Sequence, residues 1–124
     1  MAALATGVVV VVALLHAWFL VLEMFLWQTP YGMRTFGTTP EFAAASAVLA
    51  ANQGLYNGFL AAGLLWTLAS HGVVRGRATL TFFLGYVLVA GIYGGITANP
   101  KILWVQAVPA LVALAAVWAT HDRR

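Results

Sequence analysis

Apolar residues run along this chain in four long stretches, separated by short polar connections. The stretches cover residues 5–27, 41–70, 78–98 and 102–120. Each has about the 20 residues that a helix needs to cross a ~30 Å hydrocarbon core. Their apolar residues are continuous rather than alternating, which is typical of helices and not of barrel strands. The pattern predicts an all-α fold, with a transmembrane bundle of four helices forming a single domain over residues 1–124.

The connections carry the residues that normally interrupt helices. Residues 28–40 contain two Thr-Pro pairs and are predicted to be a loop that caps the outer face of the bundle. Residues 71–77 contain two glycines and two arginines, and Asn99-Pro100 ends the third stretch. Residues 121–124 form a polar tail.

The composition supports a lipid environment. Hydrophobic residues make up 63% of the chain and charged residues only 7%, whereas a soluble domain has about 25% charged residues. There is no cysteine, which excludes disulfides and thiol nucleophiles. No basic residue precedes the first apolar stretch, so we expect it to be a retained helix rather than a cleaved signal peptide.

The basic residues predict the orientation, because Lys and Arg collect in cytoplasmic loops. Four spans put both termini and the second connection on one side, which carries Arg75, Arg77, Arg123 and Arg124. The other side carries Arg34 and Lys101. We therefore predict cytoplasmic termini and a multi-pass protein of the plasma (inner) membrane, and the modest bias leaves dual insertion open. Basic residues this few and scattered predict no nucleic-acid partner.

Small residues recur every four positions in the second stretch, where they form one flat ridge: Ser46, Ala50, Gly54, Gly58 and Ala62. The third stretch has Gly91-x-x-x-Gly95. Such ridges let helices approach closely in lipid. They indicate either packing within the bundle or a homo-oligomer contact through the glycines, and the small size of the bundle favours an oligomer.

Two ionisable side chains stand within the first stretch. His16 and Glu23 are seven residues apart, so they share one helix face. Polar groups at membrane depth are costly and tend to face a partner or a cavity. Either residue is a catalytic acid–base candidate. The alternative makes Glu23 an interfacial residue and His16 a hydrogen-bonded residue between helices.

Four polar side chains of the second stretch cover about 140° of one helix face. With two more from the third and fourth stretches, they predict a polar pocket that opens outward and binds a substrate. The pocket candidates are Asn52, Gln53, Tyr56, Asn57, Tyr93 and Gln106. The alternative is interhelical hydrogen bonding, worth about 0.6–2 kcal/mol for each bond.

Two further features concern the helices themselves. Pro109 is expected to kink the fourth helix, because proline has no N–H to donate. The five tryptophans lie largely near predicted helix ends, as in an aromatic belt.

Several motifs carry a family resemblance. They are the Asn-Gln-Gly-x-Tyr-Asn-Gly run at 52–58, the His16 to Glu23 segment, Gly91-Ile92-Tyr93-Gly94, and Lys101 with Gln106 and Pro109. Together they resemble a family of small bacterial four-helix membrane proteins known only as a domain of unknown function. The resemblance covers nearly the whole chain and implies the four-span architecture, but it implies no activity or cofactor.

Two broader likenesses concern function. In length, span count and a single Glu in the first helix, the chain is similar to the small multidrug exporters, whose Glu exchanges protons for lipophilic cations. It is also similar to small four-helix membrane enzymes that act on lipophilic substrates. Among these, styrene oxide isomerase has a Leu-Asn-Gly-like stretch where Tyr56-Asn57-Gly58 stands here, and it uses haem. That likeness implies haem as a cofactor, for which His16 would be the candidate ligand.

These observations leave three hypotheses. The first is an acid–base enzyme of isomerase type, or a binding protein, for a small lipophilic molecule. In that case Glu23 or His16 moves the proton, and the pocket residues hold a substrate oxygen. The second is a proton-coupled small-molecule exporter that uses Glu23. The third is a non-catalytic membrane accessory subunit, whose amides only tie helices together.

Overall fold

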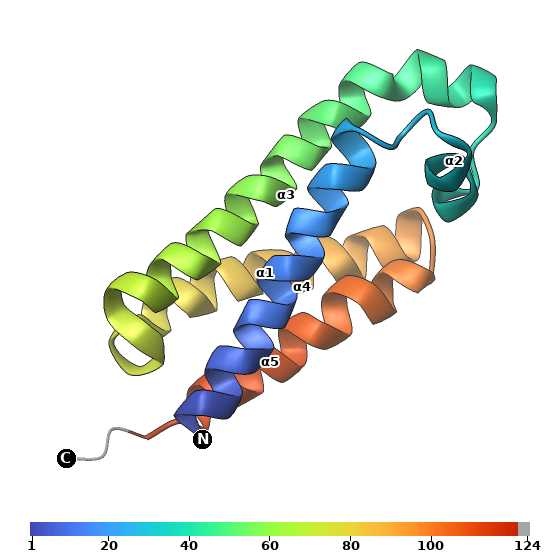
Figure 1. Ribbon diagram of the computed structural model, residues 1–124. Helices are drawn as coiled ribbons and strands as arrows, with labels where there is room; N and C mark the ends of the chain where they lie inside the picture. The colour runs from blue at the N-terminus through green and yellow to red at the C-terminus, as the bar shows by residue number, and fades with distance from the viewer. Residues whose placement is uncertain (122–124) are drawn as a thin grey trace. The chain divides into compact units, whose positions relative to one another are not determined.

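The computed structural model describes residues 1–121. Within that range the chain is all-α, with five α-helices and one π-helical segment. The elements are α1 (Ala2–Met24), α2 (Pro30–Phe36), α3 (Pro40–Arg75), α4 (Arg77–Thr97), the π-helical η1 (Leu103–Ala107) and α5 (Val108–Trp118) (Figure 1). The predicted polar tail lies outside the described residues from position 122 onward, including Arg123 and Arg124 of the orientation argument.

The expected count of four helices is wrong, because the first connection contains the additional helix α2. The Thr29 hydroxyl accepts a hydrogen bond from the Gly32 N–H at 3.1 Å and so caps the start of this helix. Pro30 occupies the first helical turn, where its missing N–H does no harm. Gly37 ends the helix at φ 66°, a left-handed conformation that suits glycine. Each of these signals is visible in the segment that the sequence predicts to be a loop.

Helix α3 extends further than the predicted stretch, but it is interrupted near its end. Gly72 has φ 66° and ψ −174°, so the regular helix stops there and residues 73–75 form a separate turn. Glycine adopts this positive φ without a steric cost. The break lies two residues beyond the predicted end of the second stretch.

The fourth stretch changes from π-helical to α-helical form next to its proline, and the kink expected at Pro109 stays a prediction. Pro109 stands in the first turn of α5, and the helix widens to the π form over Leu103–Ala107 immediately before it. Proline cannot donate to the carbonyl four residues earlier, and its ring crowds that carbonyl. A π-helical turn is a common adjustment to such a conflict.

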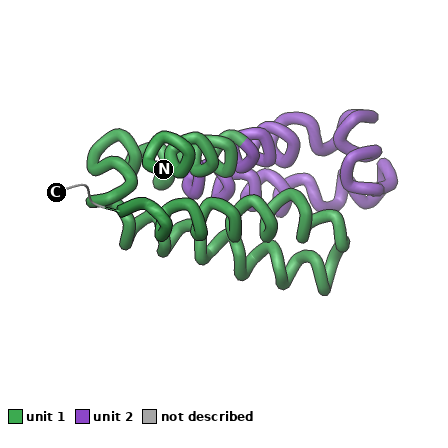
Figure 2. The backbone as a smooth tube through the Cα atoms, turned by 90° about the horizontal axis from the view of Figure 1, so that it is seen from below, with its two compact units in different colours: residues 1–14, 62–124 green, residues 15–61 purple. Residues whose placement is uncertain are grey.

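The described chain forms two compact units, coloured separately in Figure 2. Unit 1 contains residues 1–14 and the described residues from Ala62 onward, and unit 2 contains residues 15–61. Helices α1 and α3 contribute to both units.

Within unit 1, α4 packs tightly on η1 through glycines. A Cβ atom at Gly91 would lie 2.6 Å from the Ala107 nitrogen and 2.9 Å from the Gln106 Cβ, and at Gly95 it would collide with Leu103. The Gly91-x-x-x-Gly95 ridge therefore packs within the chain. Fully buried apolar side chains from α4 and α5 complete this core, namely Leu80, Leu84, Val87, Ala110, Ala113 and Val117.

Within unit 2, α2 is tied to the helices on either side of it. The Trp27 indole Nε1 donates a hydrogen bond to the Ser46 hydroxyl at 3.1 Å, and the Trp27 ring lies 4.8 Å from that of Phe36. The rings of Trp18 and Tyr31 meet edge to face at 6.4 Å. These contacts pack α2 against α1 and link it, through Trp27, to the first two turns of α3.

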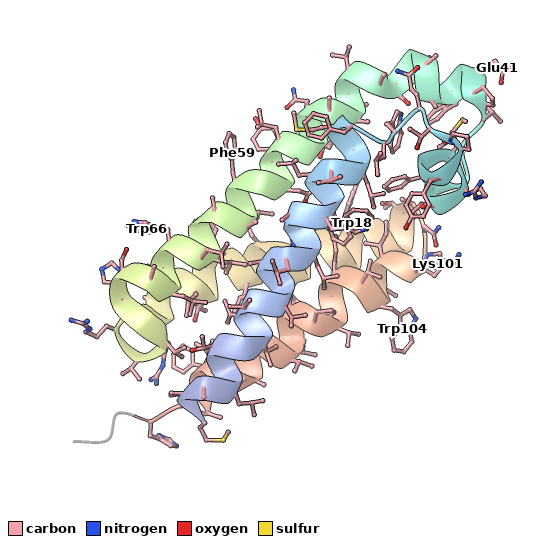
Figure 3. All side chains as sticks on the ribbon, viewed as in Figure 1. Trp18, Glu41, Phe59, Trp66, Lys101 and Trp104 are labelled. Carbon is pink, nitrogen blue, oxygen red and sulfur yellow. The ribbon has the colours of Figure 1, made fainter. Side chains whose placement is uncertain are left out.

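Two helices of the described chain, α1 and α4, are long and apolar enough to cross a membrane. Core helices of soluble proteins also have such sequences, but they are mostly buried, whereas only 28% of the most apolar window is buried in each of these. Large apolar side chains project from several helices, among them Phe59, Trp66 and Trp104 (Figure 3). The chain is therefore a helical protein with a weak signature of membrane association, and the four-span count stays a prediction.

Candidate functional site

A hydrogen bond between two polar side chains of unit 2 joins Glu23 of α1 to Asn57 of α3. The Asn57 amide Nδ2 donates a hydrogen bond to the Glu23 carboxylate Oε1 at 2.7 Å, across 34 residues of sequence. This distance is at the short end of the range for N–H···O bonds. Both side chains are half-buried. The structure thus brings together two of the predicted site residues, one from α1 and one from α3.

Glycine makes this contact geometrically possible. A Cβ atom at Gly54 would lie 2.8 Å from Met24 Cγ, 3.0 Å from Glu23 Cβ and 3.2 Å from the Leu20 carbonyl oxygen. One turn further on, a Cβ at Gly58 would collide with the Leu20 side chain. Helices α1 and α3 therefore cross at the two glycines, and Asn57 lies on the same side of α3 because it is three residues from Gly54. We call this the glycine crossing.

His16 occupies a different environment from Glu23. Its side chain is only 1% exposed, and its ring meets the ring of Phe19 edge to face at 5.2 Å. Seven residues of helix separate the two groups by about 10 Å along the axis, too far for direct proton transfer. His16 is therefore a core side chain in this conformation, and Glu23 is the more accessible of the two acid–base candidates.

The residues around His16 do not fit a haem group. An axial ligand must present a ring nitrogen to iron in a space wide enough for the porphyrin, whereas His16 is 1% exposed and packs against Phe19. Residues 1–121 also contain no cluster of three or more His, Cys, Asp or Glu side chains that would hold a metal ion. We therefore derive no chemistry through haem.

The predicted polar face of α3 divides into two parts. Asn57 points toward Glu23, whereas Asn52 and Gln53 occupy exposed positions. Tyr56 is 60% exposed, and its ring lies edge to face with that of Phe59 at 6.0 Å. Three of the four predicted binding residues on this helix therefore point outward.

The remaining two predicted site residues belong to unit 1. Tyr93 is 70% exposed on α4. Gln106 is half-buried in η1, where its Cβ packs against Gly91. Their part in a shared site with Glu23 stays a prediction.

Sequence reasoning overlooked the partnership of Trp27 with Ser46. Trp27 is predicted to be a belt residue and Ser46 a ridge residue, yet the indole donates to the hydroxyl. Trp27 stands three residues before α2 and Ser46 ten residues after it, and no pattern in the sequence pairs them.

Taken together, the exposed apolar helices and the Glu23–Asn57 pair define a small helical protein with one acidic candidate site. Residues 10–118 match the family described as a protein of unknown function (DUF1304), and the chain belongs to this family. The match contains the whole glycine crossing and confirms that the resemblance is to an uncharacterised family.

A curated relative matches this chain over most of the length of both proteins. The chain is 32% identical over 109 residues to the uncharacterised protein YpaA of Lactococcus lactis subsp. lactis (strain IL1403), and the match covers 83% of this chain and 87% of that protein. No solved structure matches the chain.

Proposed function

We propose that this chain is a membrane-embedded acid–base enzyme of isomerase type, or a binding protein, for a small lipophilic molecule. Glu23 is its proton-exchanging group. The observation that carries the proposal is the 2.7 Å hydrogen bond from Asn57 to the Glu23 carboxylate at the glycine crossing. A carboxylate on an apolar helix, oriented by a fixed amide, has the placement that a general base or acid needs.

The exposed apolar surface supports the membrane part of the proposal. Val89 and Ile96 of α4 are 68% and 78% exposed, and Leu14 of α1 is 58% exposed. Large apolar side chains exposed along long apolar helices favour a membrane contact. We propose that α1, α3, α4 and the η1–α5 segment each span the plasma (inner) membrane, with both termini in the cytoplasm.

Isomerisation suits this residue set because it needs only proton movement. The Glu23 carboxylate would take a proton from a carbon next to a substrate carbonyl, and the electron pair would move onto the carbonyl oxygen. Return of the same proton to another carbon completes the reaction and restores the carboxylate. No nucleophile and no redox group takes part.

We propose that a second copy of the chain packs against the polar face of α3. Asn52 and Gln53 are exposed, and uncovered amides are costly at membrane depth. Gly54 and Gly58 are already in contact within the chain. We therefore propose that a homo-oligomer contact runs over the neighbouring amides, which donate and accept and so can pair with their own copies.

The test compares Glu23→Gln with Glu41→Gln, the same change at an exposed acid at the start of α3. Purified protein in lipid nanodiscs is given 3-cyclohexenone, a small lipophilic ketone whose conjugated isomer absorbs in the ultraviolet. General base catalysis contributes about 10²–10⁴-fold, so Glu23→Gln should lose at least about 100-fold of the isomerisation rate while Glu41→Gln keeps it. Equal rates in both variants would exclude acid–base work by Glu23 on this substrate class.

The same proteins distinguish the exporter hypothesis. Tetraphenylphosphonium is a lipophilic cation, and its binding to an exporter of this kind would release a proton from Glu23 into a weakly buffered solution. The exporter hypothesis predicts proton release by the wild-type chain and by Glu41→Gln, but not by Glu23→Gln. If this pattern is observed and the wild-type chain isomerises no ketone, the exporter replaces the enzyme proposal.

A further inference from the structure

A groove is formed by residues of unit 1 alone. It has a volume of about 540 Å³ and runs along the connection between α3 and α4 and the end of α5. Its lining residues are Val74, Arg75, Arg77, Ala78, Thr81 and Trp118. The lining contains two arginines and no carboxylate.

Arg77 is held in place by several contacts. Its Nη2 donates to the Thr120 carbonyl oxygen, and its guanidinium carbon lies 5.4 Å from the centroid of the Trp118 ring. The Trp118 indole Nε1 in turn donates to the Thr81 hydroxyl at 3.1 Å, and that hydroxyl donates to the Arg77 carbonyl oxygen at 2.8 Å. These contacts form a closed set between the start of α4 and the end of α5. The guanidinium is therefore already oriented, and binding at this site would lose little side-chain freedom.

The positive charge of this groove is not balanced by any of its lining residues. The Nε–H of Arg77 is buried and has no hydrogen-bond partner among the described residues. Arg75 is exposed at the same groove and adds a second positive charge. An anion with several acceptor oxygens would fit both cations, and phosphate matches the planar guanidinium well.

We propose that this groove binds the phosphate group of an anionic phospholipid. Arg75 would pair with the phosphate, Arg77 would supply the fixed positive charge, and the Val74–Trp118 side of the groove would contact the glycerol and upper acyl chain. A tryptophan beside arginines is typical of the membrane–water interface. The predicted orientation places these arginines on the cytoplasmic side, where an anionic leaflet attracts basic residues.

The test measures lipid adducts by native mass spectrometry on the full chain. Short-chain phosphatidylglycerol is titrated against phosphatidylcholine for wild type, Arg75→Gln, Arg77→Gln and the control Arg34→Gln. Arg34 is an exposed arginine of α2 and does not line the groove. Each basic residue near a membrane surface contributes enough to change affinity about fivefold.

We expect wild type to prefer phosphatidylglycerol over phosphatidylcholine, and Arg75→Gln to weaken that preference about fivefold while Arg34→Gln leaves it unchanged. Arg75→Gln keeps the test valid even if Arg77→Gln unfolds, because Arg75 is exposed. Equal binding of the two lipids to wild type, or equal losses in Arg75→Gln and Arg34→Gln, would overturn the proposal. Displacement of phosphatidylglycerol by millimolar inorganic phosphate would overturn the lipid assignment and leave a site for free phosphate.

Discussion

The glycine crossing makes a quantitative prediction for Gly54→Ala. The added Cβ would lie 2.8 Å from Met24 Cγ, 3.0 Å from Glu23 Cβ and 3.2 Å from the Leu20 carbonyl oxygen. Two of these neighbours, a Cβ and a backbone oxygen, cannot turn aside as the end of a flexible side chain can. Helices α1 and α3 must therefore separate slightly, and overpacking of this kind costs about 1–3 kcal/mol.

A helix-propensity gain opposes that cost, so a matched control is needed. Replacing a glycine inside a helix by alanine stabilises the helix by up to about 1 kcal/mol. The control Gly85→Ala in α4 gains the same helix-propensity stabilisation, but its new Cβ would have no neighbour within 4 Å. The difference between the two variants removes the propensity term, so Gly54→Ala should be less stable than Gly85→Ala by about 1–3 kcal/mol.

The assay is reversible unfolding in mixed detergent–lipid micelles by increasing dodecyl sulfate, followed by circular dichroism. Gly58→Ala should fall between the two other variants, because its new Cβ meets only the side-chain end of Leu20. A free energy of unfolding for Gly54→Ala equal to that of Gly85→Ala would show that the two helices do not cross at Gly54.

Three further predictions use single contacts. Asn57→Ala removes the amide that donates to the carboxylate and should lower the free energy of unfolding by about 1 kcal/mol. The control Gln28→Ala changes an exposed residue of the first connection and should alter this free energy by less than about 0.5 kcal/mol; equal effects would contradict the pairing. A double-mutant cycle of Trp27→Phe with Ser46→Ala should give a coupling of about 0.5–1 kcal/mol, and additive losses would mean that the indole bond does not form. Pro109→Ala restores an N–H donor, so hydrogen–deuterium exchange over residues 102–112 should slow as the π-helical turn becomes regular; unchanged exchange would argue that another residue causes the π turn.

The helical class and most helix positions could be predicted because continuous apolar runs and their breakers are local properties. Pro100 and Pro109 act on their own backbone, so their effects are visible in the sequence. The short helix α2 was missed for the opposite reason. Its capping residues are common in turns, and a helix of 7 residues is stable only through contacts such as that of Trp27 with Phe36.

The candidate site could be predicted only in part. Periodicity places Asn52, Gln53 and Asn57 on one face, but it does not determine which edge of that face meets another helix. The glycines decide this, since α1 approaches α3 along Gly54 and Gly58 and leaves Asn57 inside and Asn52 outside. The contact of Arg77 with Trp118 could not be predicted for the same reason, because it depends on how the start of α4 packs against the end of α5.

Packing and the proposed chemistry therefore depend on the same few atoms of unit 2. The Cβ of Glu23 is one of the groups that leaves no space for a side chain at Gly54, and its carboxylate is the group that Asn57 holds. Any substitution that separates the helices would also weaken this hydrogen bond, so a loss of activity in Gly54→Ala alone would not identify a catalytic group. Glu23→Gln keeps the Cβ and nearly the same volume while it removes the ability to exchange a proton. If Glu23→Gln unfolds like wild type but no longer isomerises the substrate, the proposed role of Glu23 in proton exchange is separated from its role in packing.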